Sequence, residues 1–412
     1  MLDDTARIEQ GLEETFARYQ TRIAGLRPPP TLATMPNPTP EDIQPLSDAL
    51  QSTTLFARAA GHWIWSKGTQ NVVSVDWIAD WLAPQYNFSQ PARPLAERVV
   101  HILSTTDAKI RYCTAVWGAQ VEKTIAIDRF AYVYPFGEFA ATHRLEFADR
   151  AQTTNFLGPY RSAVTGEPTI VISIDSADFP FLSDDPRKQA ECARKLALEG
   201  EIACLAMIVL GTRRPIIDVS WFEYDDDALN SVWREGRRYW RTPEVLPTKI
   251  DPVQVNLNGF SALLSKLRST PPQWQEKLLL SIRRFELSLA RREIGNQAID
   301  LCTAFEQVLG SDGRSPISWT NGLRCAALIG GTPQDKRDKR DIIEKLYITR
   351  NAFVHGGRVG RELNLRIRGK VRVEEAMELA RSIYSSAVEK LIEFGSEPDW
   401  FELETTGTLV PK

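Results

Sequence analysis

Apolar residues recur every three or four positions through the C-terminal third of the chain, which is the spacing of amphipathic helices. Leu278, Ile282, Phe285 and Leu289 give the clearest case, because these four would share one helix face. Prolines near the starts and glycines near the ends of such segments mark their limits. We therefore predict helices at 259–269, 273–292, 295–309, 316–329, 335–355 and 374–395. Their short connections predict an all-α helical bundle over 258–412.

The N-terminal two thirds of the chain have a mixed pattern. Apolar residues near helical spacing predict an amphipathic helix over 3–24, and the prolines that follow predict a stiff linker or extended arm over 26–46. Beyond the arm we predict helices at 47–60 and 186–199, and strands at 124–127, 130–134, 169–174, 206–210 and 216–221. The last two strands flank a segment rich in turn-forming residues, which predicts a hairpin. The fold class is thus an α+β N-terminal domain followed by the bundle, divided at 1–46, 47–257 and 258–412.

Composition narrows the classes of function. The 412 residues carry a formal net charge of −3, so RNA could be bound only through a local basic patch. The five cysteines are scattered and include no CxxC pair, which argues against a disulfide framework and against a zinc ribbon. The acidic start lacks the features of a signal peptide, and no apolar run approaches the roughly 20 residues of a membrane span. These features predict a cytoplasmic protein.

Arg350, Asn351 and His355 form the polar group that carries most chemical information, late in the predicted helix at 335–355. A histidine can act as acid or base near neutral pH, and a guanidinium fits a phosphate and its transition state. Asn351 and His355 share one side of a helix, whereas Arg350 stands about 140° from His355 at ~100° per residue and must reach around. No metal-ligand cluster accompanies them. RNA supplies its own 2′-hydroxyl nucleophile, so the group predicts metal-free cleavage of RNA.

A known family shares this pattern. The segment LYITRNAFVHG at 346–356 resembles the R-x(4–6)-H signature of HEPN domains. The upstream segments AFEQVL at 304–309 and LRCAAL at 323–328 resemble the preceding helices of the Apea-like HEPN group, which occurs in bacterial anti-phage proteins. The resemblance covers roughly residues 273–396 and leaves the N-terminal two thirds unexplained.

The resemblance implies a helical bundle that dimerises through the motif face. It also implies an endoribonuclease that needs neither metal nor cofactor and leaves 2′,3′-cyclic phosphate and 5′-OH ends. By the same resemblance Arg350 and His355 are catalytic, and Asn351 supports them. Glu306 is either a buried carboxylate that pairs with Arg350 or a structural or surface residue without a role in the site, and we expect Tyr347 to support the site.

A basic run follows the motif. Its alternation of apolar and basic residues predicts a short strand or extended flap around 365–372. Beside the site the run could hold RNA phosphates, or it could be an ordinary solvated loop face. Its cationic members are Arg358, Arg361, Arg366, Arg368, Lys370 and Arg372.

Two further groups have competing interpretations. Asp225, Asp226 and Asp227 resemble a metal cluster, but consecutive acids point in different directions, so the start of a helix is the preferred interpretation. Four tryptophans fit either a core or a ligand-binding surface, namely Trp63, Trp65, Trp77 and Trp81.

These observations lead to a ribonuclease effector of a bacterial anti-phage defence, abortive-infection or toxin system. Its partners would be RNA such as tRNA or mRNA, a second copy of the chain, and a phage-derived trigger or an antitoxin. The N-terminal domain would sense the trigger or restrain the nuclease. The alternatives are a non-catalytic module for dimerisation or RNA binding, with the function in the N-terminal domain, and a plain structural or interaction protein.

Overall fold

The computed structural model describes residues 3–26, 38–66, 69–86, 91–139, 168–210, 216–230, 239–240, 253–310 and 316–412. The chain divides into two units. One comprises Met1–Cys113, Ile174–Leu198 and Ser220–Tyr239, and the other comprises Thr114–Ser173, Glu199–Val219 and Trp240–Lys412. Distant segments join in the second unit because β4 (Ala119–Gln120) pairs in parallel with β11 (Val253–Gln254). The units therefore do not follow the contiguous predicted division at 1–46, 47–257 and 258–412.

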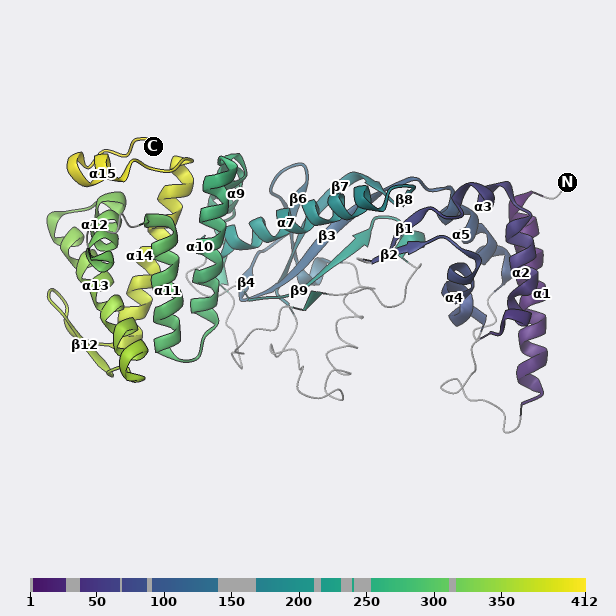
Figure 1. Ribbon diagram of the computed structural model, residues 1–412, viewed down its shortest axis with the longest axis horizontal. Helices are drawn as coiled ribbons and strands as arrows, with labels where there is room; N and C mark the ends of the chain where they lie inside the picture. Colours follow the sequence, from purple (N-terminus) through teal and green to yellow (C-terminus); the bar gives the residue numbers. More distant parts are fainter. Residues whose placement is uncertain are drawn as a thin grey trace. The chain divides into compact units, whose positions relative to one another are not determined.

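The N-terminal part mixes helices and sheets, as predicted at the level of fold class (Figure 1). Its helices are α1 (Asp4–Ala24), α2 (Pro40–Gln51), α3 (Thr54–Ala59), α4 (Val75–Tyr86), α5 (Ala92–Ser104), the one-turn η1 (Phe136–Glu138), α7 (Pro186–Leu210) and α8 (Asp227–Asn230). A three-stranded sheet has the order β2 (Thr69–Val72), β1 (Trp63–Ser66) and β8 (Leu182–Ser183). A six-stranded sheet has the order β10 (Tyr239–Trp240), β9 (Ile216–Tyr224), β3 (Asp107–Trp117), β7 (Ile170–Pro180), β6 (Ala131–Pro135) and β5 (Ile125–Ala126).

Helix α2 replaces the second half of the predicted arm at 26–46. Thr39 and Asp42 form a capping box, and Pro40 occupies the first helical position, where its missing N–H costs no hydrogen bond. Gly11 of α1 allows α2 to approach closely, since a Cβ there would lie 2.5 Å from the Cβ of Ala49. The prediction of an extended arm is therefore wrong from residue 40 onward. A proline at the first position of a helix stabilises the start of the helix and does not break it. Residues 27–37 lie outside the described residues.

The ion pair between Asp42 and Arg22 should make α1–α2 packing sensitive to acid. Their closest atoms are 2.7 Å apart. Burial acts to raise the pKa of Asp42, but the Thr39 N–H, the Arg22 guanidinium and the Thr39 hydroxyl together lower it below the ordinary 3.8. Ionised Asp42 thus stabilises the fold above that value, and the contribution is lost as the pH falls through the lowered folded-state pKa. We expect Asp42→Asn to cost about 1 kcal/mol at pH 7.

Urea unfolding between pH 7 and pH 3 measures this effect. The difference in unfolding free energy between wild type and Asp42→Asn should shrink below about pH 4. A difference that stays constant over this range would show that the Asp42 charge does not stabilise the fold.

Helix α7 extends the predicted helix at 186–199 and overturns the predicted hairpin. Residues 206–210 complete the helix instead of forming a strand. Residues 202–209 are all buried, and a helix that is apolar on every side cannot be told from a buried strand by its pattern. The second predicted strand exists as β9, while the turn at 211–215 lies outside the described residues.

The remaining strand predictions in this part are confirmed. β5 and β6 pair antiparallel, with Ile125 opposite Val133, and β7 begins at the predicted Thr169–Ile174 run. β-Branched residues in short runs thus identified the sheet, although pattern alone gave no strand order.

The acidic triplet leads into α8, as preferred from the sequence. Asp226 accepts the Ala228 N–H at 2.8 Å and lies 2.6 Å from His101 Nε2. Burial acts to raise the pKa of Asp226, but the hydrogen bonds from His101 and Ala228 lower it overall. Within the described ranges, no group of three or more His, Cys, Asp or Glu side chains could hold a metal ion.

The N-terminal tryptophans belong mainly to the core. Trp65, Trp77 and Trp81 are buried, while Trp63 is half-buried. The Trp77 and Trp81 rings stack with centroids 6.3 Å apart, and Trp65 meets the Phe179 ring edge-on at 5.9 Å. The ligand-surface interpretation therefore has no support at the three buried positions.

Helices dominate the C-terminal part, and every predicted one is present with ends shifted by at most two residues. They are α9 (Leu257–Ser269), α10 (Pro272–Ala290), α11 (Ile294–Leu309), α12 (Ile317–Ile329), α13 (Pro333–Gly356) and α14 (Val373–Phe394), followed by a short α15 (Trp400–Thr406). The predicted strand or flap is an antiparallel hairpin of β12 (Glu362–Leu365) and β13 (Gly369–Arg372), so this part is not purely helical. No described helix is long and apolar enough to cross a membrane.

Tyr384 lies at the centre of the bundle core. Its ring stacks on Phe285 with centroids 4.4 Å apart and meets Phe305 edge-on at 5.3 Å. Its hydroxyl lies 2.6 Å from Ser281 Oγ, which itself donates to the Ala304 carbonyl at 2.7 Å. Tyr384 therefore donates to Ser281, and both buried hydroxyls are satisfied.

A buried arginine ties the end of the chain to the bundle. Arg324 of α12 pairs with Glu404 of α15 at 2.5 Å and also donates to the Leu309 carbonyl. Its guanidinium lies over the Trp400 ring, 5.1 Å from the centroid. The Arg324 guanidinium is thus buried together with hydrogen-bond acceptors, and these offset the cost of removing its charge from water.

Candidate active site

Helix α13 carries the motif and remains regular to its last turn. Thr332 and Asp335 form a capping box at its start. At its end Gly357 adopts φ 64°, and its N–H reaches the Phe353 carbonyl at 2.8 Å. His355 therefore lies within an unbroken helix. Arg350, Asn351 and His355 keep the helical spacing that was predicted from the sequence.

The surroundings of α13 change along its length. Residues 341–343, 346, 347 and 349 are buried against the bundle. In the last two turns Asn351, Ala352 and His355 are exposed, and so are the apolar Ile348 and Val354, at 46% and 52%. The motif thus lies on a helix end that the rest of the bundle leaves open.

Arg350 is half-buried, and its guanidinium turns toward the exposed side of the helix. Its Nη1 donates to Asn351 Oδ1 at 3.1 Å. Asn351 shares its side of the helix with His355 one turn later, whereas Arg350 and His355 stand about 140° apart. The structure thus brings Arg350 and Asn351 together, and among the described contacts none joins Arg350 to His355.

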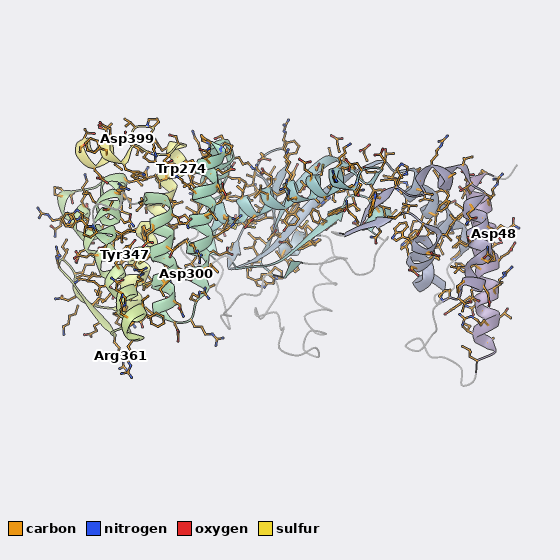
Figure 2. All side chains as sticks on the ribbon, in the orientation of Figure 1. Asp48, Trp274, Asp300, Tyr347, Arg361 and Asp399 are labelled. Carbon is orange, nitrogen blue, oxygen red and sulfur yellow. The ribbon has the colours of Figure 1, made fainter. Side chains whose placement is uncertain are left out.

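Polar residues collect beneath the motif, between α11, α12 and α13. Figure 2 labels Tyr347, whose hydroxyl accepts the Asn321 Nδ2–H at 2.7 Å. Burial raises the pKa of Tyr347 above its ordinary value, and the neighbouring Cys302 and Glu306 raise it further. The phenol is therefore held protonated and able to donate.

The predicted pairing of Glu306 with Arg350 is not found. No ion pair within 4 Å joins them in the described part of the chain; Arg350 instead donates to Asn351. Glu306 is half-buried, and its charge is among the causes that raise the pKa of Tyr347. Glu306 and Arg350 do not pair because Arg350 turns toward Asn351 on the exposed side of the helix.

Gly295 fixes the open end of α13 against the start of α11. A Cβ on Gly295 would lie 2.0 Å from Phe353 Cγ, so the ring packs directly on the glycine backbone. Phe353 lies between Arg350 and His355 in the sequence. This contact therefore sets the position of the motif turn.

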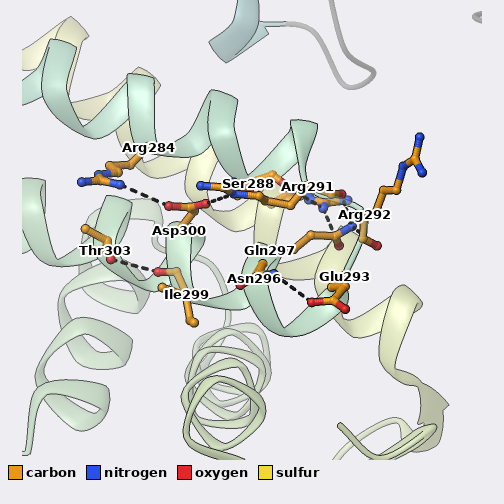
Figure 3. A network of polar contacts seen from close by, with 11 residues as sticks. Arg284, Ser288, Arg291, Arg292, Glu293, Asn296, Gln297, Ile299, Asp300 and Thr303 are labelled. Carbon is orange, nitrogen blue, oxygen red and sulfur yellow. Dashed lines mark hydrogen bonds and ion pairs between the residues drawn. The ribbon is translucent and has the colours of Figure 1, made fainter. Parts of the chain in front are cut away.

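A polar network holds the α10–α11 connection in place (Figure 3). Buried Asp300 pairs with Arg291 at 2.8 Å and with Arg284 at 3.3 Å. Gln297 donates to the Arg291 carbonyl at 2.8 Å. The start of α11, including Gly295, is therefore anchored on both sides of the connection.

Around the β12–β13 hairpin, two of the six cations of the basic run are neutralised by carboxylates of α13. Arg366 pairs with Glu344 at 3.2 Å, and its N–H donates to the buried Asp341 at 2.6 Å. Arg368 pairs with Asp338 at 2.7 Å. RNA phosphates would have to displace these carboxylates, so the arginines hold the hairpin on α13.

The other four cations of the run are more available. Lys370 has only a distant partner, Glu362 at 3.9 Å. In the described structure no ion pair engages the exposed Arg358, Arg361 and Arg372, and Figure 2 labels Arg361 at the edge of the bundle. A role in RNA binding, predicted for all six, is best supported for these last three.

Asn321 is a residue of this region that sequence reasoning missed. It lies on the buried side of α12 together with Cys325 and Leu328, at spacings of four and seven residues. A polar residue on an apolar helix face was the available signal, because burial of an amide requires a partner.

Comparison of the chain with protein-family models, with curated proteins and with solved structures finds no match. The function of the protein is therefore inferred from the chemistry of its own residues. A guanidinium and a carboxamide joined by a hydrogen bond, with a histidine one turn away, can bind a phosphodiester and exchange protons with it.

Proposed function

We propose that this protein is a metal-independent endoribonuclease of the HEPN type that works as a homodimer. The observation that carries the proposal is the open end of α13. There Arg350 donates to Asn351, and exposed His355 follows on the same side of the helix as Asn351. The imidazole would accept the proton of the 2′-hydroxyl as its oxygen bonds to phosphorus, and the guanidinium would stabilise the charge of the transition state. The bond from phosphorus to the 5′-oxygen would break, and the departing oxygen would take a proton from solvent to leave as 5′-OH.

The dimer follows from the arrangement of the two catalytic side chains. Arg350 and His355 project about 140° apart on one regular helix, so one chain does not direct both side chains at the same phosphate. Two-fold pairing of α13 ends would supply Arg350 from one chain and His355 from the other. The exposed Ile348 and Val354 are apolar contacts that such an interface would cover.

The cellular role we propose is that of an effector in bacterial anti-phage defence or in a toxin system. Uncontrolled RNA cleavage harms the cell that carries the enzyme, so a second part that senses a trigger or restrains cleavage is expected. The mixed N-terminal part is available for that role.

The test uses the full-length protein, total cellular RNA and tRNA, with EDTA present. We expect cleavage that leaves 5′-OH ends, which accept phosphate from a kinase directly, and cyclic 3′ ends, which resist phosphatase. Induced expression should also slow bacterial growth. His355→Ala should lose both effects, while Arg337→Ala, a change of an exposed arginine early in the same helix, should keep them.

Two results would overturn the proposal. One is a wild-type protein that neither cuts RNA nor slows growth. The other is a His355→Ala protein that does both as well as wild type.

A non-catalytic docking module is the second candidate. It is favoured by the exposed apolar residues at the α13 end and by the wide separation of Arg350 and His355 within one chain. Under this alternative the protein would dimerise and bind RNA with strong salt dependence, but it would yield no product.

A further inference from the structure

An exposed tryptophan and an arginine form a flat pair on the surface of the bundle. Trp319 lies in the first turn of α12 and is 52% exposed. The Arg340 guanidinium of α13 lies over its ring, 3.7 Å from the ring centroid. A single exposed tryptophan is ordinary on a protein surface, so the meaning of this pair depends on the charges around it.

The acidic residues of the first half of α13 all have other partners. Asp335 belongs to the capping box at the start of the helix. Asp338 and Glu344 pair with arginines of the β12–β13 hairpin at 2.7 and 3.2 Å, and Asp341 accepts a hairpin N–H at 2.6 Å. The mixed charges of this segment therefore do not cancel one another at its surface.

Two cations of α13 are left without an acidic partner. Arg340 and Lys336 are one helical turn apart and share a side of the helix, and no ion pair of the described residues includes either of them. Single-stranded RNA matches both the ring and the cations, because its bases stack on aromatic rings and its phosphates attract positive charge. An acidic peptide without aromatic residues would match only the charge.

The same side of α13 leads from this pair to the candidate active site. Asn351 follows Arg340 by eleven residues, or about three turns, so both project to one side of this regular helix. At ~1.5 Å per residue they lie about 16 Å apart along the helix, which is the length of about five stacked nucleotides at ~3.4 Å each. One strand can therefore reach Trp319 and the Arg350–Asn351 pair together.

We propose that Trp319 and Arg340 form a docking site for single-stranded RNA. One base stacks on the exposed surface of the indole ring, and Arg340 and Lys336 hold phosphates beside it. The inference rests on the proposed ribonuclease function, because it takes RNA as the ligand, and it adds a place where the substrate is held apart from the point of cleavage. Every base has a face that can stack, so this site reads no sequence.

The experiment measures binding of the full-length protein to a uridine dodecamer with 2′-O-methyl groups, which lacks the attacking hydroxyl and is not cut. Phe401→Ala is the matched control, because Phe401 is an aromatic residue that is 70% exposed on α15. We expect Trp319→Ala to weaken binding by roughly 5- to 100-fold, Trp319→Phe to recover part of the loss, and Phe401→Ala to change nothing. Arg340→Gln should lower the salt dependence, because one phosphate contact is lost. Binding of a duplex should not depend on Trp319, because its bases are already stacked.

Three results would overturn the docking site. They are equal binding of the dodecamer by wild type and Trp319→Ala, an equal dependence of duplex binding on Trp319, and tighter Trp319-dependent binding of polyglutamate than of RNA. The last result would assign the surface to an acidic protein.

Cleavage of unmodified RNA tests the ribonuclease separately. Where wild type cuts, Trp319→Ala should raise KM and leave kcat unchanged, because the lost contact binds substrate and transition state alike. An unchanged KM would overturn the docking site and leave the ribonuclease standing. Trp319-dependent binding by a wild-type protein that does not cut RNA would overturn the ribonuclease and leave the docking site standing.

Discussion

A heterodimer of one Arg350→Ala chain and one His355→Ala chain is expected to cleave RNA at about half the wild-type rate, because one of its two symmetric sites stays intact. Each variant homodimer should be slower than wild type by roughly 10²-fold or more, since every site would then lack its guanidinium or its imidazole. The expectation follows from the unbroken α13, which separates the two side chains around the helix axis. The Arg350 of one chain would act with the His355 of the other.

Co-expression with two different affinity tags, followed by purification through both, gives the heterodimer without either homodimer. A wild-type pair carrying the same two tags is the control for tag effects. A heterodimer as inactive as both homodimers would show that Arg350 and His355 act from the same chain. Failure to recover any doubly tagged protein would argue against the dimer itself.

Gly295→Ala is expected to destabilise the bundle by about 1–3 kcal/mol, despite the usual helix preference for alanine. The new Cβ would lie 2.0 Å from Phe353 Cγ. Carbon contacts need roughly 3.5 Å, so the ring would have to move by ~1.5 Å. The gain of about 0.5–1 kcal/mol from removing a helical glycine is smaller than this clash. Since Phe353 lies within the motif turn, RNA cleavage should fall as well.

Thermal unfolding and amide hydrogen exchange at 291–299 and 349–357 measure the change. Gly356→Ala is the matched control, because a Cβ there meets nothing within 4 Å and should stabilise slightly. Adding Phe353→Ala to Gly295→Ala should restore part of the lost stability. Two additive losses, without any recovery, would contradict the contact.

The sequence predicted the C-terminal helices well for a physical reason. Their apolar stripes keep a period near 3.6 and their ends carry proline and glycine, so each helix can be recognised alone. The same rule failed at 206–210, where α7 is buried on every side and no polar face marks the period. It also failed at Pro40, which starts α2 and was assigned to an extended arm. The first error arises where tertiary packing decides what local pattern cannot. The second arises from a local signal that was missed, the capping box of Thr39 and Asp42.

The candidate site was predictable in part. Spacing along one helix placed Asn351 on the same side as His355. It also led us to expect that Arg350 reaches around toward His355, whereas in the structure Arg350 donates to Asn351 instead. Contacts between helices were beyond it, and so the hydrogen bond between Asn321 and Tyr347 depended on the structure. The basic run shows the same limit, because its pairing with Asp338 and Asp341 joins residues some 25 to 30 positions apart.

The pairing of Arg324 with Glu404 also has a consequence for the order of events during translation. The two residues are 80 positions apart, and the arginine comes first. While the ribosome is still adding the intervening residues, the guanidinium has no counter-charge and its burial is unfavourable. The α12 region thus cannot close fully on the nascent chain until α15 has been made. For the proposed ribonuclease, this delay would keep a half-made chain from becoming active beside the message that encodes it.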